Sequence, residues 1–481
     1  MLLAIIAPHP ISVTMPNVIF AGSENFEVTY PVIVIGGGGC GLCAALAIRD
    51  SDEDVLLLEQ DKSLLGTTAM STGLIPASGT TDQQEKNIND TPEIFAADIM
   101  NKTKGEANPI VVKACTETSV DTVMWLKHTH NVNLNLIDGF LYPGHSHMRM
   151  YGMPNRSGAE LMGALNAAAE AAGVDILTEA LVDTLYANRD GVIQGVKIKR
   201  PDGNEETIGC KALILACCGF AGDAKLVEKF IPEMTNAVFH GHPGNKGHAM
   251  IWGQNLDAAL SDMSSYQGHA GLAYGHGIPI LWPLIMEGGF QVNKMGERFS
   301  DETQGYSEQA VKVLAQDDSV AWSIYDETRH QPMLQFDDYQ DALRANAIKR
   351  ADSLEGLAEI LGLPANNLIR THQAATAATQ GQVDKFGRNF LGKAPLTPPF
   401  YGAKVTGALF HTQGGLEINA SAQVLRKDGT PFKNLFAGGG AARGISGSGA
   451  SGYLAGNGLL TATSLGKLAG RAAAKLVSTQ S

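Results

Sequence analysis

The sequence predicts an α/β fold: a Rossmann-type nucleotide-binding domain with an α+β domain inserted into it. Residues 32–35 form an apolar, β-branched run that ends in the glycine-rich segment 36–41, and residues 42–48 then follow a helical pattern. Residues 55–59 form a second buried strand. Strand, glycine loop, helix and strand in this order make one βαβ unit. A more aromatic and charged stretch later separates this unit from the strands that complete the fold.

The glycine loop indicates a dinucleotide site. Gly36, Gly38 and Gly41 satisfy the pattern G-x-G-x-x-G, with Gly39 between them. Glycine allows the tight turn, the close approach of backbone N–H groups to a pyrophosphate, and close packing of helix on strand. Glu59 ends the next strand, where its carboxylate can accept a ribose hydroxyl. We therefore expect an NAD-like or FAD-like dinucleotide.

The elements after this unit follow in order. Helices are expected from about residue 93, from about 109 and over 157–172, where Ser157 and Glu160 have capping-box spacing. Short strands over 181–186, 192–199 and 206–208, separated by turn residues, predict an antiparallel meander. A buried strand over 212–216 follows it.

The second half of the chain predicts an insertion and a return. Between about 264 and 399, helices are expected near 353–361 and 370–379. Strands return at 415–418, 424–426 and 434–437, before a final helix from 459 to about 475. The expected organisation is an N-terminal extension at 1–30, a nucleotide-binding domain in two segments at 31–263 and 400–481, and an inserted catalytic domain at 264–399.

Composition narrows the class of partner and the compartment. The 36 Lys and Arg against 49 Asp and Glu give a net charge of −13, which argues against nucleic acid or an anionic membrane surface as the main partner. The first residues lack the basic segment of a signal peptide, and residues 31–48 are interpreted as strand and loop, so no integral membrane segment is expected. Six irregularly spaced cysteines, Cys217 and Cys218 adjacent among them, suit the cytoplasm.

Five further segments add to the glycine loop: 66–73, 244–248, 293–302, 410–415 and 435–439. In this order they resemble the superfamily of FAD enzymes that contains the fumarate reductases and 3-ketosteroid dehydrogenases, from about residue 32 to 474. The resemblance implies FAD as the cofactor. Gly440 stands where many such enzymes carry an acidic residue on the ribityl chain, so that contact must come from elsewhere or be absent. The further residues expected at the FAD are Gly66, Thr67, Thr68, Ser71, Gly73, Gly439, Gly440 and Leu459.

Two positions depart from the fumarate reductase pattern. That pattern has an arginine that clamps a substrate carboxylate where this chain has Tyr453, and a proton-donating arginine where it has Tyr306. Both tyrosines match the 3-ketosteroid dehydrogenase pattern. A guanidinium offers paired donors and a full charge to a carboxylate, whereas a phenol offers one donor, which suits a ketone oxygen.

The resemblance to the ketosteroid enzymes implies roles for these residues. Tyr453 holds the carbonyl oxygen with the backbone N–H of Gly456 or Asn457, and Tyr306 removes the α-proton while the β-hydrogen leaves as hydride to the flavin N5. We therefore predict an FAD-dependent dehydrogenase acting on CH–CH groups. It desaturates a 3-ketosteroid or a smaller cyclohexanone-type ketone to the α,β-unsaturated ketone.

The roles of Tyr306 and His411 keep more than one interpretation. A phenol with a pKa near 10 is a poor base at neutral pH, so Tyr306 needs a lowered pKa or a relay, for which Tyr142 and Tyr151 are both candidates. His411 matches the histidine that binds a carboxylate in fumarate reductases. It is a substrate contact, a flavin neighbour or a histidine satisfied by backbone.

Two other functions compete with ketone desaturation. A fumarate-type reductase of an unsaturated acid is supported by His411, Arg298 and Arg443, but it needs an anion clamp that Tyr453 cannot provide. A flavin-binding electron carrier would have no organic substrate. The cysteines show no haem or iron–sulfur pattern, so electrons must pass to an external acceptor. The histidines of 240–248 lack carboxylates or cysteines at ligand spacing, so no metal is expected.

Overall fold

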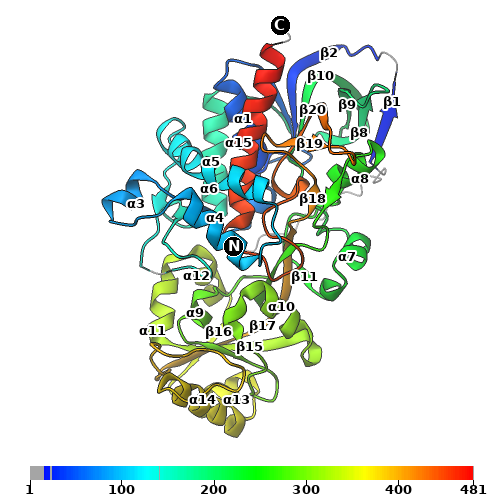
Figure 1. Ribbon diagram of the computed structural model, residues 1–481. Coiled ribbons are helices and arrows are strands. Elements are labelled where there is room, and N and C mark those ends of the chain that lie inside the picture. The colour runs from blue at the N-terminus through cyan, green and yellow to red at the C-terminus, as the bar shows by residue number, and fades with distance from the viewer. Residues whose placement is uncertain (1–15, 22–23, 140, 480–481) are drawn as a thin grey trace.

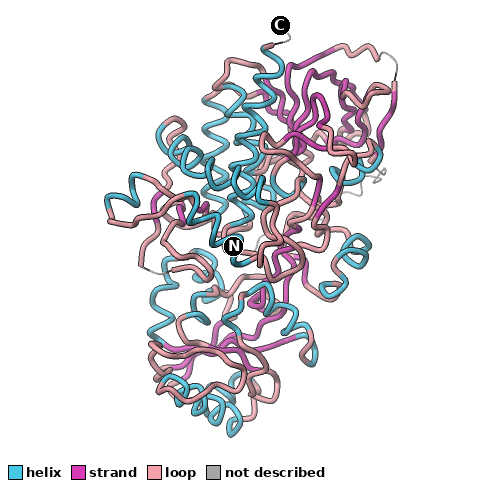
Figure 2. The backbone as a smooth tube through the Cα atoms, in the orientation of Figure 1, coloured by secondary structure: helices cyan, strands magenta, loops and turns pink. Residues whose placement is uncertain are grey.

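The structure is a computed structural model that describes residues 16–21, 24–139 and 141–479. Figure 1 shows an upper body with long helices beside a large sheet and a lower body built on a second sheet. Figure 2 shows helices and strands segregated to opposite sides of the upper body. The α/β class predicted from the sequence is confirmed. Most of the predicted extension, residues 1–15 and 22–23, lies outside the described residues.

The upper sheet contains nine strands among the described residues. Its centre is parallel: β10 (Glu205–Leu215) pairs with β2 (Val28–Ile35) and β20 (Pro431–Ala437), and β2 continues to β3 (Val55–Leu58) and β7 (Asp175–Leu177). The predicted meander is confirmed, since β8 (Leu181–Ala187), β9 (Ile193–Lys199) and β10 are antiparallel. The predicted strands at 206–208 and 212–216 are one continuous strand, β10. β1 (Asn17–Phe20) and β19 (Gln423–Leu425) complete the sheet.

Long helices cover this sheet. α1 (Gly39–Arg49) and α15 (Asn457–Ser478) cross closely, because a Cβ at Gly466 or Gly470 would lie 2.3 Å from the carbonyl oxygen of Cys40 or Ala44. α5 (Pro109–His128) and α6 (Gly158–Ala171) flank them (Figure 1). This packing places the N-terminal ends of α1 and α15 at the carboxyl edge of the parallel strands.

The lower sheet has six strands among the described residues. β17 (Phe400–Thr412) is its hub and pairs with β11 (Val238–Phe239), β13 (Tyr266–Ala273), β15 (Val320–Asp326) and β16 (Ile348–Ala351), while β14 (Phe290–Val292) pairs with β15. α13 (Leu354–Leu361) and α14 (Ala365–Thr379) pack on this body. β11 and β17 lie outside the segment 264–399, so this sheet extends beyond the predicted insertion at both ends.

The predicted capping box of α6 is wrong: the Ser157 side chain makes no cap hydrogen bond, and Glu160 accepts the Asn155 N–H at 3.0 Å instead.

Among the described residues, every helix is too short or too polar to span a bilayer. The short strands are β4 (Ile75–Pro76), β5 (Asn135–Leu136), β6 (Met150–Gly152), β12 (Leu260–Ser261) and β18 (Gly415–Leu416). The short helices are α2 (Gly66–Ala69), α3 (Thr81–Glu85), α4 (Pro92–Lys102), α7 (Ala224–Phe230), α8 (His248–Asn255), α9 (Pro283–Met286), α10 (Tyr306–Leu314), α11 (Glu327–His330) and α12 (Asp337–Arg344).

Candidate active site

One long cavity runs from the glycine loop to the lower sheet. Its walls include the ends of β2, β3 and β10, the start of α1, the α2 segment, and side chains of β13 and β17. The carboxyl ends of parallel strands at such a crevice are where α/β folds bind dinucleotides. The cavity therefore joins a nucleotide-binding half to a second chamber that faces the lower body.

The glycine loop has the geometry that a pyrophosphate needs. Gly36 has a φ of 108°, and a Cβ there would lie 2.5 Å from the Ala216 carbonyl oxygen. A Cβ at Gly41 would lie 1.8 Å from the carbonyl oxygen of Gly36, so Gly41 closes the turn behind the cavity wall. Gly38 caps α1 without a side-chain hydrogen bond, and together with Gly39 it lines the cavity. Because Gly38 has no side chain to accept from them, the N–H groups in the first turn of α1 can donate to phosphate oxygens.

Glu59 lies in the cavity wall at the end of β3. Its Oε2 accepts the Gly37 N–H at 2.8 Å and its Oε1 accepts the Asp61 N–H at 2.9 Å. Burial raises the pKa of this carboxyl, and the two N–H groups oppose that rise. Each oxygen keeps a further acceptor position, which could receive a hydrogen bond from a ribose hydroxyl. His242, 2.5 Å from Asp61, covers the same end, and this ion pair raises the pKa of the imidazole.

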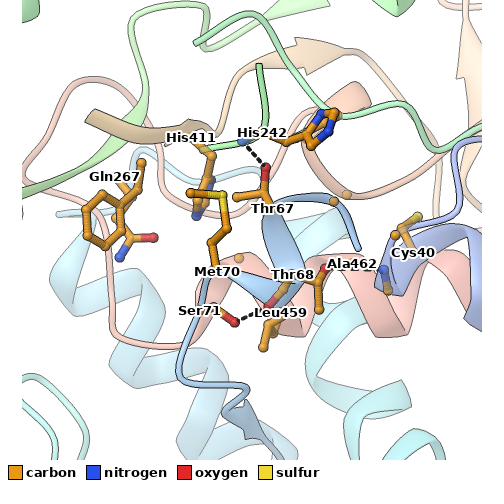
Figure 3. A pocket seen from close by; sticks show the side chains of 18 of the residues that line it. Cys40, Thr67, Thr68, Met70, Ser71, His242, Gln267, His411, Leu459 and Ala462 are labelled. Atoms are coloured by element: carbon orange, nitrogen blue, oxygen red, sulfur yellow. Dashed lines mark hydrogen bonds between the residues drawn. The ribbon is translucent and has the colours of Figure 1, made fainter. Parts of the chain in front are cut away.

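The α2 segment forms the opposite wall (Figure 3). Thr68 accepts the Gly39 N–H at 3.2 Å, and the Ser71 hydroxyl donates to the Thr68 carbonyl at 2.7 Å. Thr67 accepts the backbone N–H of His242 at 3.2 Å. Gly66 lines the cavity, whereas Gly73 does not: a Cβ there would lie 2.9 Å from the Ser157 carbonyl oxygen, so Gly73 serves packing.

The C-terminal segment supplies the third wall. Gly439, Gly440 and Leu459 line the cavity; on α15, Leu459 lies beside Thr68 and Ala462 lies toward Cys40 of α1 (Figure 3). A Cβ at Gly440 would meet the Gly219 backbone nitrogen at 3.0 Å. The close backbone approach at Gly440 leaves little room for the acidic side chain that many members carry there.

The structure brings Tyr306 and Tyr453 together in the second chamber. Their ring centroids are 6.1 Å apart, although one residue begins α10 of the lower body and the other lies in the loop before α15. The Tyr453 hydroxyl accepts the Gly458 N–H at 3.3 Å. Burial raises the pKa of both phenols, and for Tyr306 the neighbouring Tyr453 adds to the effect. Both phenols are neutral hydrogen-bond donors at ordinary pH.

The two backbone groups predicted to hold the carbonyl with Tyr453 lie in different settings. Asn457 is fully buried, its N–H donates to the Leu454 carbonyl at 3.1 Å, and its side-chain amide donates to Ser446. It does not line the cavity, whereas Gly456 does. The N–H that reaches Tyr453 belongs to Gly458, where a Cβ would lie 2.7 Å from His411 Nε2.

His411 lies beside Tyr453, with ring centroids 5.8 Å apart. Gln413 Nε2 lies 3.0 Å from its Nδ1, and the Thr412 carbonyl oxygen lies 3.3 Å from the same nitrogen. If Nδ1 accepts from the amide, Nε2 carries the proton; if Nδ1 donates to the carbonyl, Nε2 is an acceptor. Burial lowers the pKa of His411 to about 4, so the ring is neutral. Of the two candidate relay tyrosines, Tyr142 lines the cavity and influences the Tyr306 phenol electrostatically, while Tyr151 lies outside it and shares a short hydrogen bond with Thr80.

Sequence reasoning missed a ring-lined wall on the lower body. His269 of β13 stacks on Phe410 with centroids 5.1 Å apart and lies 5.2 Å from the Tyr306 ring. Burial lowers the pKa of His269 to about 3. Trp282 and Gln267 also line this wall. A histidine or tryptophan on an apolar strand has the same local pattern as a core residue, so no sequence signal marked it.

The charges of the chamber are equally informative. Among the described residues, the cavity lining contains no lysine or arginine. Arg298 pairs with Glu302 and Asp384, and Arg443 pairs with Asp262 and Glu417. Asp338 of α12 lines the chamber, and burial together with the neighbouring Asp341 and Asp337 raises its pKa to about 6. The described residues also include no cluster of three side chains able to hold a metal ion.

A glycine-loop dinucleotide groove that opens into a chamber of aromatic and proton-bearing side chains defines a redox enzyme class. The chain belongs to the FAD binding domain family, which matches residues 31–459. FAD is therefore the cofactor, and the protein is an FAD-dependent oxidoreductase of the superfamily of fumarate reductases and 3-ketosteroid dehydrogenases.

Two curated relatives are reductases. The chain is 26% identical over 458 residues to NADH:fumarate oxidoreductase of Klebsiella pneumoniae (strain 342). The match covers 94% of this chain and 48% of that protein, so this chain spans about half the length of that relative. It is 26% identical over 464 residues to vinyl phenol reductase of Lactiplantibacillus plantarum, covering 87% and 91% of the two chains.

Two solved structures share the fold. A flavocytochrome c3 fumarate reductase in an open conformation superposes with a TM-score of 0.79 at 26% identity, covering 94% of this chain and 79% of that one. The 3-ketosteroid-Δ4-(5α)-dehydrogenase of Rhodococcus jostii RHA1 superposes with a TM-score of 0.74 at 23% identity, covering 94% and 98%.

Proposed function

We propose that the protein oxidises the CH–CH bond next to an uncharged ketone and releases the α,β-unsaturated ketone. One observation carries the proposal: two phenols face each other in a chamber whose described lining holds no lysine or arginine. A neutral carbonyl needs one or two hydrogen-bond donors and no counter-charge. The flat rings of His269, Phe410 and Trp282 suit a cyclic substrate, either a 3-ketosteroid or a smaller alicyclic ketone.

Each tyrosine has a separate role. Tyr453 donates its O–H to the carbonyl oxygen, and the Gly458 N–H donates to the same phenol oxygen, which makes the O–H a stronger donor. Because burial keeps the Tyr306 phenol protonated, Tyr306 takes the proton of the α-carbon only as its own O–H proton passes to Tyr142 in the same wall, which in turn releases its proton to solvent. FAD, when bound, supplies the chemistry that accepts the hydride from the β-carbon. Electrons then leave to an acceptor outside this chain.

The reverse reaction is the second candidate, and one observation favours it. The raised pKa of Tyr306 keeps its proton in place, which suits a group that donates a proton to the α-carbon of an uncharged alkene. Reduction of an uncharged conjugated alkene also agrees with the name of the vinyl phenol reductase relative. Both directions use the same two phenols.

Reduction of an unsaturated acid is less well supported. Arg298 and Arg443 are held by carboxylates, and the neutral His411 offers a substrate carboxylate no charge. The substrate carboxylate would have to enter beside Asp338, and the described lining residues include no lysine or arginine to pair with it.

A substrate panel tests this proposal. The holoenzyme is mixed anaerobically with cyclohexanone-type and 3-ketosteroid substrates, and the oxidised flavin band is followed. Bleaching by a ketone supports desaturation. Reoxidation of dye-reduced enzyme by an uncharged enone or vinyl arene, without bleaching by ketones, supports the reverse reaction. Reoxidation by fumarate alone refutes both.

We also propose a cytoplasmic location, which six free cysteines suit. Cys40, Cys43, Cys115 and Cys210 are buried, and burial raises the pKa of the Cys217 thiol to about 12. Such thiols are protonated and poorly reactive.

The segment 264–399 contributes Tyr306 and Trp282 to the chamber, which supports its proposed role as the substrate side of the enzyme.

A further inference from the structure

Two charged side chains of helix α4, Asp98 and Lys102, lie outside the lining of the catalytic chamber. Asp98 and Lys102 are four residues apart, so they lie on the same face of the helix. Figure 1 shows α4 near the junction of the two bodies. Each side chain begins a chain of contacts, and the two chains end at the segments that hold Tyr453 and Tyr306.

The first arm runs through a buried ion network to the Tyr453 loop. Asp98 accepts from Arg149 Nη1 at 2.5 Å, and Asp90 accepts from two other nitrogens of the same guanidinium at 2.8 and 2.9 Å. Arg149 is 1% exposed. Its Nη1 lies 3.2 Å from Nδ1 of His145, and Nε2 of His145 lies 2.9 Å from the carbonyl oxygen of Ala455.

These contacts fix the tautomer of His145. A guanidinium can only donate, so Nδ1 of His145 accepts and carries no proton. Nε2 therefore bears the hydrogen and donates it to the Ala455 carbonyl, two residues after Tyr453. Burial and the adjacent Arg149 charge lower the pKa of His145 to about 4, so this arrangement holds throughout the ordinary pH range.

The second arm grips the segment that begins α10. Lys102 Nζ donates to the Gln304 carbonyl at 2.8 Å and to Glu308 Oε1 at 2.5 Å. These partners lie two residues before and two residues after Tyr306. The Lys102 and Glu308 side chains are only 18% and 17% exposed, so this pair is shielded from water, unlike a surface ion pair.

We propose that α4 sets the placement of the two phenols, with Lys102 as the positioning residue of Tyr306 and His145 as the positioning residue of Tyr453. This inference rests on the proposed function only for its catalytic consequence. One helix is thereby linked to both tyrosine segments, directly through Lys102 and through Arg149 and His145 from Asp98, although these segments come from different bodies of the protein. Neither Lys102 nor His145 lines the chamber, so both act through the segments that they hold.

Hydrogen exchange in the FAD-loaded protein tests the placement without a substrate. Lys102→Met is expected to speed amide exchange in α10 at least about 10-fold, the loss of a hydrogen bond to a charged group, and to leave the Tyr453 loop unchanged. His145→Leu is expected to do the reverse, at the amides of Tyr453 and Asn457 that donate to Ala450 and Leu454. Lys102→Gln replaces Lys102→Met if the latter fails to fold.

Matched controls come from elsewhere in the chain. Lys127→Met breaks the ion pair with Asp82, which is similarly shielded and outside the chamber. His372→Leu removes a histidine whose Nε2 lies 2.9 Å from the Leu396 carbonyl. Exchange in both tyrosine segments that matches these controls would overturn the proposal.

Flavin bleaching adds the catalytic readout. Lys102→Met should slow bleaching about 10- to 100-fold with the ketone Kd unchanged, since it displaces the proton acceptor. His145→Leu should raise the Kd as well, because Tyr453 holds the carbonyl. Lys102→Arg and His145→Gln, which keep a donor, should restore most of the rate, and equal defects in these variants refute positioning. If no ketone bleaches the wild-type flavin, the proposed function fails, whereas exchange still decides the role of α4.

Discussion

Replacing Tyr453 by phenylalanine removes one oxygen atom that, in this structure, has one identified partner. The Gly458 N–H donates to that oxygen at a long 3.3 Å, in the first turn of α15, where water in the cavity can replace it. The cost to folding should therefore stay near the ordinary value of about 0.5–1.5 kcal/mol for one hydrogen bond. In the transition state of the proposed reaction, the same hydroxyl would face a developing enolate oxygen. Losing one such donor costs about 2.7–4 kcal/mol, or about 10²- to 10³-fold in rate.

The assay separates the two costs. Anaerobic stopped-flow mixing with the best ketone of the panel measures the bleaching rate, flavin absorbance after purification measures retained FAD, and thermal unfolding measures stability. Tyr325→Phe is the matched control, because Tyr325 is also buried but its hydroxyl bonds to Tyr339 at 2.8 Å, away from the chamber. A Tyr453→Phe enzyme that keeps its FAD and bleaches within about 3-fold of wild type would refute the carbonyl-holding role.

Three other substitutions test separate parts of the site. Tyr306→Phe should slow bleaching about 10²- to 10⁴-fold with FAD and the ketone Kd retained, and a Kd that rises in step with the loss would contradict a proton-transfer role. Gly41→Ala should yield protein depleted of flavin, because the new Cβ would lie 1.8 Å from the Gly36 carbonyl oxygen; a yellow protein at normal FAD occupancy would contradict the loop geometry. Asp338→Asn should stabilise the protein above pH 6 and leave it unchanged near pH 4, measured by thermal unfolding across pH. The raised pKa of Asp338, about 6 against 3.8, means that wild-type stability falls as pH rises through this window, by about 1–3 kcal/mol, so a flat difference across pH would contradict burial of that carboxyl.

Most of the upper body could be predicted because its signals are local. The glycine loop, the β-branched strands and the turns of the meander can each be recognised from a stretch of about ten residues. β17 could not be placed in this way. It forms the hub of the lower sheet by pairing with β11, more than 160 residues earlier, and with three strands of the insertion. Such pairing partners leave no mark in either local sequence.

The α6 capping box shows a second limit. Ser157 and Glu160 have the right spacing, but the chain before α6 is pressed against the α2 segment. The Gly158 N–H donates to the Ser71 carbonyl at 2.7 Å, and a Cβ at Gly158 would lie 2.1 Å from the Thr68 carbonyl oxygen. Tertiary packing therefore decides the geometry of this helix start, and the cap is lost.

The candidate site divides along the same line. Tyr306 and Tyr453 could be identified because they stand at two positions of a known pattern, and the structure places their rings 6.1 Å apart. His269 could not, because it enters the chamber only through the pairing of β13 with β17. Of the two backbone donors predicted beside the carbonyl, Asn457 has its N–H bonded to the Leu454 carbonyl and lies outside the cavity lining, whereas Gly456 lines the cavity. Gly458, which was not predicted, donates to the Tyr453 hydroxyl itself.

The electrostatics of the chamber decide which substrates the phenols can serve. A dicarboxylate would need a cation. His269 and His411 lie beside the two phenols, and His411, which has the higher pKa of the two, is the easier to protonate. With a pKa of about 4, protonating this ring at pH 7 costs about 4 kcal/mol, which would weaken binding about 1,000-fold relative to a permanent charge. Arg298 and Arg443 are each held by two carboxylates, and moving either arginine to a substrate would leave those carboxylates unpaired. An uncharged carbonyl avoids both costs, because Tyr453 already presents a neutral donor. The fold is shared with fumarate reductases, which act on an unsaturated acid. The lower free-energy cost of binding an uncharged carbonyl is what directs the proposal toward ketones and other uncharged conjugated substrates.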